Sequence, residues 1–436
     1  MSAAAVAAVW FACGASVASA QQGATSHVLD RANLDTTCAP CTDFFTFANG
    51  GWEKRTSIPA AYSSWGSFNE LQDHNQAVVH QILDDDVAAV RAKKVKPGSE
   101  SWKVGTFYEA CMDTTAIEAL GTKPIEPEMQ EIASISDSKA LIARLGTLDA
   151  RSGVAPFGFF VRPDTKNSSE EIANAGQGGL GLPEREYYFR TDDKSKALRD
   201  AYVQHVGTML TLSGESESQA SADAQKIMDL ETKLAQASMP RVAMRDPNAT
   251  YHKMSLADMQ KLAPDLDLTS TLHALGAPTV TEINVAQPDF FRALDTLLTT
   301  VPVETWKAYL RWHLVSGAGS ALPSKFADEN FKWSQRLSGV KEQLPRWKRC
   351  AGIANGVLGE AIGQEYVKRT FTPAAKARAL KMVDNLIATL RADIGQLAWM
   401  SDATKQRAVA KLDAFTRKIG YPDKWKDYSK LEVESG

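Results

Sequence analysis

Histidine is the side chain through which this 436-residue chain could most readily perform hydrolytic chemistry, and it occurs seven times. A zinc peptidase needs two imidazoles on one helix face, spaced His-Glu-x-x-His, with the glutamate as general base. None of the seven histidines begins that motif, and His74 and His80 are too far apart around a helix to share one ion. A Gly-x-Ser-x-Gly nucleophile elbow is also missing from the sequence. We therefore expect surface or packed histidines, no catalytic residue and no metal ligand in this chain.

A second motif, Gly-x-Gly-x-x-Gly at residues 176–181, matches the dinucleotide fingerprint on paper. The mechanism of that fingerprint needs a strand before it and a helix that begins directly after it, so that helical N–H groups meet a phosphate. Glu170 and Glu171 precede the motif and Pro183 follows it almost at once. A glycine-rich surface loop is the better interpretation, and a nucleotide-dependent enzyme would be recognised by nucleotide binding to the purified chain.

Cysteine usage is compatible with an oxidising compartment. If Cys13 is removed with a leader, the five cysteines are reduced to four, which permit three pairings: Cys38, Cys41, Cys111 and Cys350. Cys38 and Cys41 form a Cys-x-x-Cys with no second such motif and no histidine nearby, which disfavours a structural zinc. We predict a local disulfide between them.

The composition is that of a soluble globular protein, with 44% hydrophobic residues, 23% charged residues and a net charge of −3. Nucleic acid is an unfavourable main partner, because phosphate binding needs a basic face. The basic cluster at residues 346–349 (RWKR) is the local exception, and we expect it to be a solvated turn with an anchored tryptophan.

Residues 1–20 differ in composition from the rest of the chain. The stretch from Ala3 to Val17 is apolar or small and uncharged, and it is followed by Ala18-Ser19-Ala20, an A-x-A cleavage pattern. It is short and alanine-rich for a membrane span. We predict a signal peptide, export to the periplasm, cell surface or medium, and no membrane span after its cleavage.

The elements that would position any site are mostly helical. Phe68, Leu71, Val78, Val79 and Ile82 fit one face of a helix that we expect to end in the solvated acidic run 84–86.

Near the C-terminus, Thr372 and Pro373 predict a helix start. One buried stripe is expected to follow it (Val383, Leu386, Ile387, Leu390, Ile394, Leu397). Ser401 would cap a second helix that runs to Gly420. With a small β hairpin near 155–175, the fold class is mainly α.

Eight short runs resemble the neprilysin and endothelin-converting-enzyme family, peptidase family M13, in the order that the family has them. They are 41–52 (CTDFFTFANGGW), 63–68 (SSWGSF), 107–112 (FYEACM), 181–188 (GLPEREYY), 251–254 (YHKM), 346–350 (RWKRC), 399–401 (WMS) and 419–422 (IGYP). Their order and spacing cover nearly the whole mature chain, which makes the resemblance specific.

The resemblance implies two mainly helical lobes around a chamber that admits peptides and excludes folded proteins. Residues 66–418 would form the large helical lobe that closes the chamber. Residues 21–65 would pack on the catalytic lobe, and 419–436 would begin the linker into it. Cys111 and Cys350 match a family disulfide, which leaves Cys38 and Cys41 to pair locally unless Cys41 bonds a cysteine in the missing part.

Two site residues are implied by position. In neprilysin the place of Ser64 holds an arginine that grips the substrate's C-terminal carboxylate, and serine cannot form that bidentate contact. The resemblance therefore favours general endopeptidase cutting over dipeptide release. Phe68 matches a family aromatic near the pocket for the residue after the cut, although a phenylalanine at a helical-stripe position is more often part of a core.

The family's zinc-binding residues lie beyond Gly436, so the resemblance implies zinc for the family but a chain that alone binds none and is inactive. One hypothesis is therefore the N-terminal part of a zinc endopeptidase that acts on small peptides. The alternative is a non-catalytic helical peptide-binding or scaffold protein. The DNA downstream of the codon for Gly436 distinguishes these two hypotheses. If the chain is a partial lobe, we expect it to expose an apolar face.

Overall fold

The computed structural model describes residues 30–434, so the predicted signal peptide lies outside the described residues. Contacts divide the chain into two compact units, residues 1–59 and 60–436. The described part of the first unit holds a 3-10 turn, η1 (Arg31–Asn33), and one helix, α1 (Phe44–Arg55). Asp43 begins α1 by accepting a hydrogen bond from the Thr46 N–H at 3.0 Å, an aspartate N-cap.

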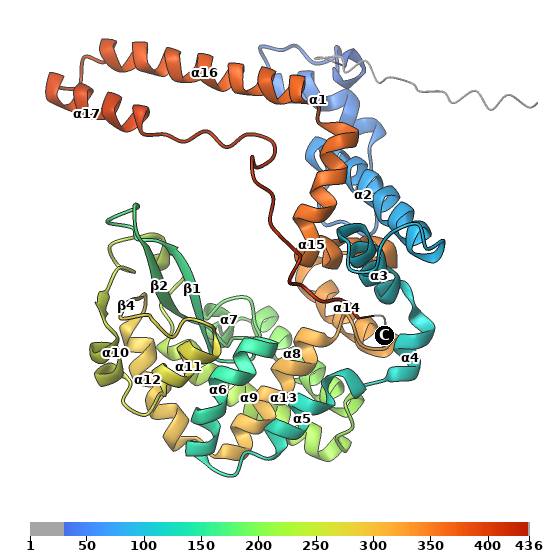
Figure 1. Cartoon of the computed structure of the whole chain (residues 1–436), viewed down its shortest axis with the longest axis vertical. Coiled ribbons are helices and arrows are strands. Elements are labelled where there is room, and N and C mark those ends of the chain that lie inside the picture. The colour runs from blue at the N-terminus through green and yellow to red at the C-terminus, as the bar shows by residue number, and fades with distance from the viewer. Residues whose placement is uncertain (1–29, 435–436) are drawn as a thin grey trace, which may run out of the picture. The chain divides into compact units, whose positions relative to one another are not determined.

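The second unit is mainly helical, which confirms the predicted fold class (Figure 1). Its elements are α2 (Ser67–Arg91), α3 (Glu100–Met112), α4 (Thr114–Leu120), η2 (Lys123–Ile125), α5 (Glu126–Ala133), α6 (Ser138–Ser152), β1 (Phe157–Pro163), β2 (Glu171–Gln177), α7 (Glu186–Phe189), α8 (Asp193–Leu212), α9 (Glu217–Ala237), η3 (Ala243–Arg245), β3 (Lys253–Ser255), α10 (Leu256–Leu262), α11 (Leu268–Ala274), β4 (Glu282–Val285), α12 (Pro288–Thr300), α13 (Val303–Ala318), α14 (Ser324–Ser338), α15 (Arg346–Thr370), α16 (Pro373–Gln396) and α17 (Asp402–Asp413). No helix in residues 30–434 is both long and apolar enough to cross a bilayer.

Two hydrophobic cores hold this unit together. The larger core is built mainly from α5, α6, α8, α9, α12, α13 and the sheet, with Trp306, Tyr309 and Phe290 among its fully buried side chains. The smaller core joins α2, α3 and α15, which lie side by side in Figure 1, and includes Tyr428 from the C-terminal segment. Lys103 on α3 is buried there and donates to the Tyr428 carbonyl at 2.6 Å, which ties that segment to α3.

The predicted hairpin is present as β1 and β2, within a four-stranded sheet of order β1-β2-β4-β3. β4 pairs parallel with β2, and Asn284 donates to the Asn174 side chain at 2.9 Å between them. β3 and β4 contain three and four residues, too few for an alternating pattern to predict them.

The prediction that one apolar face of α2 is buried is confirmed only toward the C-terminal part of the helix. Ile82 is buried, whereas Phe68 and Leu71 are exposed. The acidic run 84–86 does not end the helix, which continues to Arg91. Aspartate is tolerated inside a helix whose neighbouring face is buried, because packing outweighs intrinsic propensity.

The two C-terminal helices begin at the predicted caps, since Thr372 and Ser401 each accept a backbone hydrogen bond. Two other expectations are wrong. Within the predicted buried stripe of α16 only Ile394 is buried, because α16 packs mainly against α17. α17 ends at Asp413, seven residues before Gly420, where it was expected to stop, and Phe415 is exposed.

Candidate functional site

The region around the N-terminus of α2 carries both substrate-site residues that the sequence suggested. Tyr62 precedes this helix, and its hydroxyl donates to the Asp73 carboxylate. Lys348, from the first turn of α15, donates to Asp73 Oδ1 at 2.7 Å and to the Tyr62 hydroxyl at 2.9 Å. These contacts join α15 to two positions near the start of α2 and fix the chain that leads from Tyr62 into that helix.

Ser64 lies on this fixed segment, and its side chain is exposed. Trp65 packs edge-on against the Tyr62 ring, with centroids 4.8 Å apart. Phe68, in the first turn of α2, is 87% exposed. Among residues 30–434, Phe68 is therefore not part of a core, and it lies at the surface four residues after Ser64.

Asp73, Lys348 and Tyr62 keep the protonation states that these side chains usually have at neutral pH. Burial opposes ionisation of Asp73, but hydrogen bonds from Lys348 and Tyr62 prevail and lower the pKa of Asp73. Burial likewise opposes the charged form of Lys348, yet Asp73 and Tyr62 raise the pKa of Lys348. Burial and Asp73 raise the pKa of Tyr62. A protonated lysine, an ionised aspartate and a neutral tyrosine make a structural cluster that offers no free general base.

The basic cluster at residues 346–349 is not the solvated turn that we expected. It forms the first turn of α15, and the side chains of Arg346, Trp347 and Lys348 contact neighbouring elements. Trp347 stacks on His80 of α2 with ring centroids 4.2 Å apart, and Arg346 donates to the Cys111 carbonyl from Nε and Nη2, at 2.9 and 2.6 Å. The cluster is basic because α15 must hold α2 and α3, both of which present acceptor groups to it.

A disulfide joins Cys111 of α3 to Cys350 of α15, the pair that the family resemblance implies. Cys38 and Cys41 are separate thiols in the structure, so the predicted local disulfide is not formed there. The Cys38 sulfur is instead directed at the carbonyl oxygen of Asp43, at 3.5 Å.

The histidines in the described range are mostly held by packing. His205 stacks on Trp333 and lies 3.0 Å from Glu329, while His313 lies against Tyr309. Across residues 30–434 no group of three or more His, Cys, Asp or Glu side chains could hold a metal ion. The residues present therefore do not fit a catalytic zinc site.

The glycine-rich loop at 176–181 has a packing explanation. The strand β2, part of the predicted hairpin, runs into the loop, but the next helix begins only at Glu186. A Cβ atom on Gly181 would lie 1.8 Å from the Tyr202 hydroxyl, and one on Gly179, where φ is +79°, would lie 2.4 Å from the Tyr309 hydroxyl. The loop is glycine-rich because two buried tyrosines approach its backbone, and no helix start is present to receive a phosphate.

Beneath the loop lies Glu231, a carboxylate that sequence reasoning missed. It is fully buried and accepts hydrogen bonds from the hydroxyls of Tyr188 and Tyr202, at 2.7 and 2.9 Å, and from the Gly181 N–H at 3.2 Å. The only available signal was a glutamate among apolar residues on the inner face of the α9 pattern. Its role is to fasten the loop to α8 and α9.

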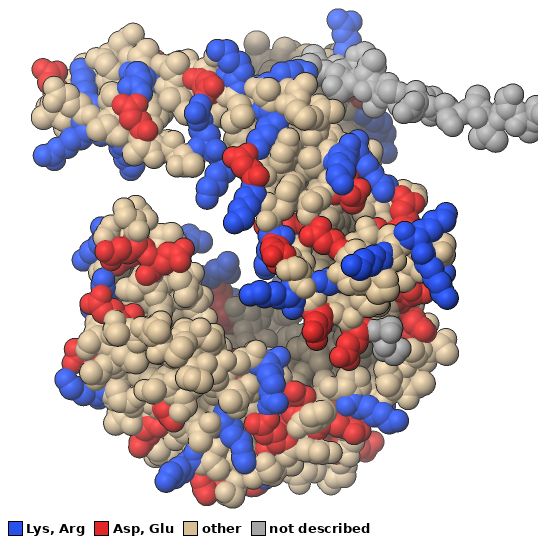
Figure 2. Space-filling model, viewed as in Figure 1, with Lys and Arg blue, Asp and Glu red and all other residues tan. Residues whose placement is uncertain are grey.

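Charged side chains of both signs are interspersed over the face shown in Figure 2. That face carries no continuous basic surface among the described residues.

Comparison with known proteins agrees with this architecture. The family profile described as peptidase family M13 matches residues 40–422. Endothelin-converting enzyme 1 of Bos taurus is 31% identical over 423 residues, which cover 94% of this chain and 54% of that protein. The human enzyme is 32% identical, with 94% and 53% covered.

Among solved structures, the zinc metalloprotease Zmp1 of Mycobacterium tuberculosis, in complex with an inhibitor, superimposes with a TM-score of 0.86. It is 34% identical, and the match covers 93% of this chain and 61% of that one. PepO of Lactobacillus rhamnosis, at 23% identity and a TM-score of 0.78, shares the fold. The chain spans about half the length of the curated relatives it matches. It belongs to peptidase family M13, and its residues correspond to the N-terminal portion of that family.

Proposed function

We propose that this chain is the N-terminal portion of an exported zinc metalloendopeptidase that hydrolyses small peptides. Its share would be the helical lobe that closes a peptide-admitting chamber, while the zinc ligands would come from a C-terminal catalytic lobe outside these 436 residues. Residues 66–418 would form the closing lobe, 21–65 would pack on the catalytic lobe and 419–436 would lead into it. The names of the relatives, endothelin-converting enzyme and zinc metalloprotease, support this class of activity.

The observation that carries the proposal is an apolar face on α16. Met382, Leu386 and Leu390 recur every four residues and are 60%, 62% and 48% exposed. Side chains four residues apart lie on one face of a helix, so the three form a continuous stripe. Trp399, just beyond α16, and Phe415 are also exposed. Contiguous apolar surface of this kind marks an interaction site, and we assign it to the remainder of the protein.

The substrate preference follows from the segment that Tyr62, Asp73 and Lys348 fix. Ser64 is exposed there but has no guanidinium with which to bind a substrate carboxylate in bidentate fashion. We therefore propose endopeptidase cutting without a preference for dipeptide release. Phe68, as an exposed aromatic in the adjacent helical turn, would contact an apolar substrate side chain.

Export is part of the proposal. The Cys111–Cys350 disulfide supports it, because such bonds persist in oxidising compartments. The leader at residues 1–20 would direct it, and cleavage after Ala20 is checked by the N-terminal sequence of the mature protein.

The decisive experiment begins with the coding sequence downstream of Gly436. If it continues in frame into a His-Glu-x-x-His segment, the whole product should cleave a short peptide in a chelator-sensitive manner. In that product the double variant Leu386→Glu/Leu390→Glu should lose most activity, whereas Leu120→Glu, at a similarly exposed leucine on α4, should not.

A stop codon directly after Gly436 would instead favour the non-catalytic peptide-binding or scaffold protein. Full activity in the α16 double variant would reject the role of the apolar stripe.

A further inference from the structure

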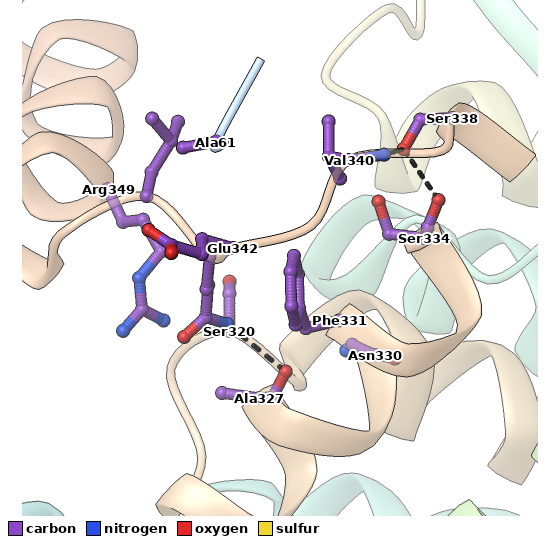
Figure 3. Close-up of a pocket in the computed structure, with 12 residues that line it drawn as sticks. Ala61, Ser320, Ala327, Asn330, Phe331, Ser334, Ser338, Val340, Glu342 and Arg349 are labelled. Carbon is purple, nitrogen blue, oxygen red and sulfur yellow. Dashed lines mark hydrogen bonds between the residues drawn. The ribbon is translucent and has the colours of Figure 1, made fainter. Parts of the chain in front are cut away.

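A pocket of about 410 Å³ lies among α14, the loop after it and the first turn of α15. Its wall is largely apolar, with Phe331, Val340 and Leu344 among the lining side chains. Figure 3 shows the Arg349 side chain extending from α15 on one side of the space and the Phe331 ring on the other. The volume lies within the range of about 300–1,000 Å³ that is usual for small-ligand sites.

Arg349 differs from Arg346 and Lys348 in the hydrogen bonding of its Nε atom. Arg346 binds the Cys111 carbonyl and Lys348 binds Asp73, but the buried Arg349 Nε has no hydrogen-bond partner in residues 30–434. No carboxylate in that range lies within 4.0 Å of its guanidinium. Buried polar groups are almost always hydrogen-bonded, so an orphaned N–H beside a pocket indicates an absent acceptor.

The charge of Arg349 also indicates that an anion is the missing partner. Burial and the nearby Arg346 charge lower the pKa of Arg349, and Asp328 only partly opposes them. Arginine nevertheless remains protonated in proteins, so the pocket contains an incompletely compensated positive charge. An anion would supply both the acceptor and the missing charge.

The pocket also restricts which anion fits. A guanidinium binds carboxylate or phosphate oxygens in a bidentate manner. Glu342 lines the same pocket and is exposed, so its negative charge opposes a dianion such as phosphate more than a single carboxylate. The apolar wall at Phe331 and Val340 favours a ligand with a hydrophobic body.

We propose that this pocket binds an apolar α-carboxylate, with the carboxylate on Arg349 and the hydrophobic side chain against Phe331. The ligand would be a free acylated amino acid or the C-terminal residue of a hydrophobic peptide. The proposal stands on the pocket alone and does not depend on the peptidase function.

Calorimetric titration of the purified chain tests it. N-acetyl-leucine should bind saturably at one site, and N-acetyl-leucinamide, which lacks the negative charge, should bind at least about tenfold more weakly. Acetyl-Ala-Ala-Leu distinguishes the two possible sources of the carboxylate, a free acylated amino acid and the C-terminal residue of a peptide. Affinity equal to or above that of N-acetyl-leucine indicates a peptide end, whereas weaker binding indicates a free amino acid. Equal affinity for acid and amide, or no saturable binding of any acid, overturns the proposal.

Two variants locate the site. Arg349→Met should weaken binding of N-acetyl-leucine at least about tenfold and leave binding of the amide unchanged. It should fold, because removing an unpartnered guanidinium leaves no new orphaned group. The matched control is Arg336→Met, an exposed arginine on α14 that does not line the pocket and should have no effect. Unchanged binding of the acid to Arg349→Met overturns the assignment. If that variant fails to fold, the relative affinity of the unaltered chain for N-acetyl-leucine and N-acetyl-leucinamide still tests the proposal.

Discussion

The guanidinium of Arg346 donates two hydrogen bonds to the carbonyl oxygen of Cys111, whose sulfur is bonded to Cys350 one turn further along α15. α15 and α3 are thus fixed to each other twice at one residue, by a covalent bond and by a charge-assisted contact. The covalent bond closes a loop of 239 residues.

Reduction of this disulfide should lower the free energy of unfolding by about 2–4 kcal/mol, because the unfolded chain regains the entropy of a long loop. Arg346→Met should lower it by about 1–2 kcal/mol, since one charge-assisted contact is lost. Urea unfolding with and without reductant measures both effects. Cys38→Ser/Cys41→Ser is the control and should leave the midpoint unchanged, and an unchanged midpoint after full reduction of Cys111–Cys350 would contradict the account.

The Lys348–Asp73 ion pair should stabilise the segment before α2 in a pH-dependent way. Lys348→Met should destabilise the chain by about 1–2 kcal/mol at neutral pH, because Asp73 loses its cation. Since the folded pKa of Asp73 is lowered, its contribution is present above 3.8 and is lost as the pH falls through the lower folded value.

The difference between Lys348→Met and the unaltered chain, followed by thermal unfolding, should therefore shrink below pH 3.8. A difference that stays constant from pH 7 to pH 2.5 would show that lost packing, and not charge, explains the effect.

Asp86 should destabilise the folded chain at neutral pH. Burial between α2 and α3 raises its pKa from 3.8 to about 6, although a hydrogen bond from Ser101 partly opposes the shift. A raised carboxyl pKa favours the folded state while the group is protonated, and that advantage is lost as the pH rises through about 6.

Asp86→Asn should accordingly raise stability by about 1–2 kcal/mol at pH 8, after allowance for solvent screening, and by little at pH 4. Melting temperatures across that range measure the effect. Asp84→Asn, at an exposed position on the same helix, is the control, and a loss of stability in Asp86→Asn at pH 8 would refute the prediction.

Gly181→Ala should cost about 2–4 kcal/mol, because the added methyl group would collide with the fully buried Tyr202 hydroxyl. The same substitution at Gly158, where a Cβ meets nothing within 4 Å, should be nearly neutral. Chemical denaturation of the two variants gives the comparison. Equal stabilities would mean that the glycine-rich loop is free to move and that its glycines need another explanation.

Sequence patterns predicted where helices begin better than they predicted which apolar side chains are exposed. The caps at Thr372 and Ser401 are local, since each depends on one side chain and the next three residues, and both are confirmed. Whether Leu386 or Phe68 is covered depends on other parts of the chain, and periodicity reports only that apolar residues share a face. Both side chains are exposed, although their spacing predicted burial.

The candidate site was predictable only in part, for the same reason. Ser64 and Phe68 could be located from the family resemblance, but their support from Lys348 comes from 275 or more residues away. The orphaned Nε of Arg349 and the buried Glu231 depend on tertiary packing that no local pattern encodes. Spacing along the chain could not show either of them.

The central claim is that the chain's catalytic chemistry is supplied from outside these 436 residues. The most direct test measures zinc content and peptide hydrolysis on the purified chain, free of other proteases. We predict no stoichiometric zinc and no chelator-sensitive cleavage, because the described residues contain no group of ligands that could hold the ion. One bound zinc per chain together with chelator-sensitive cleavage would contradict the assignment of this chain as the non-catalytic lobe.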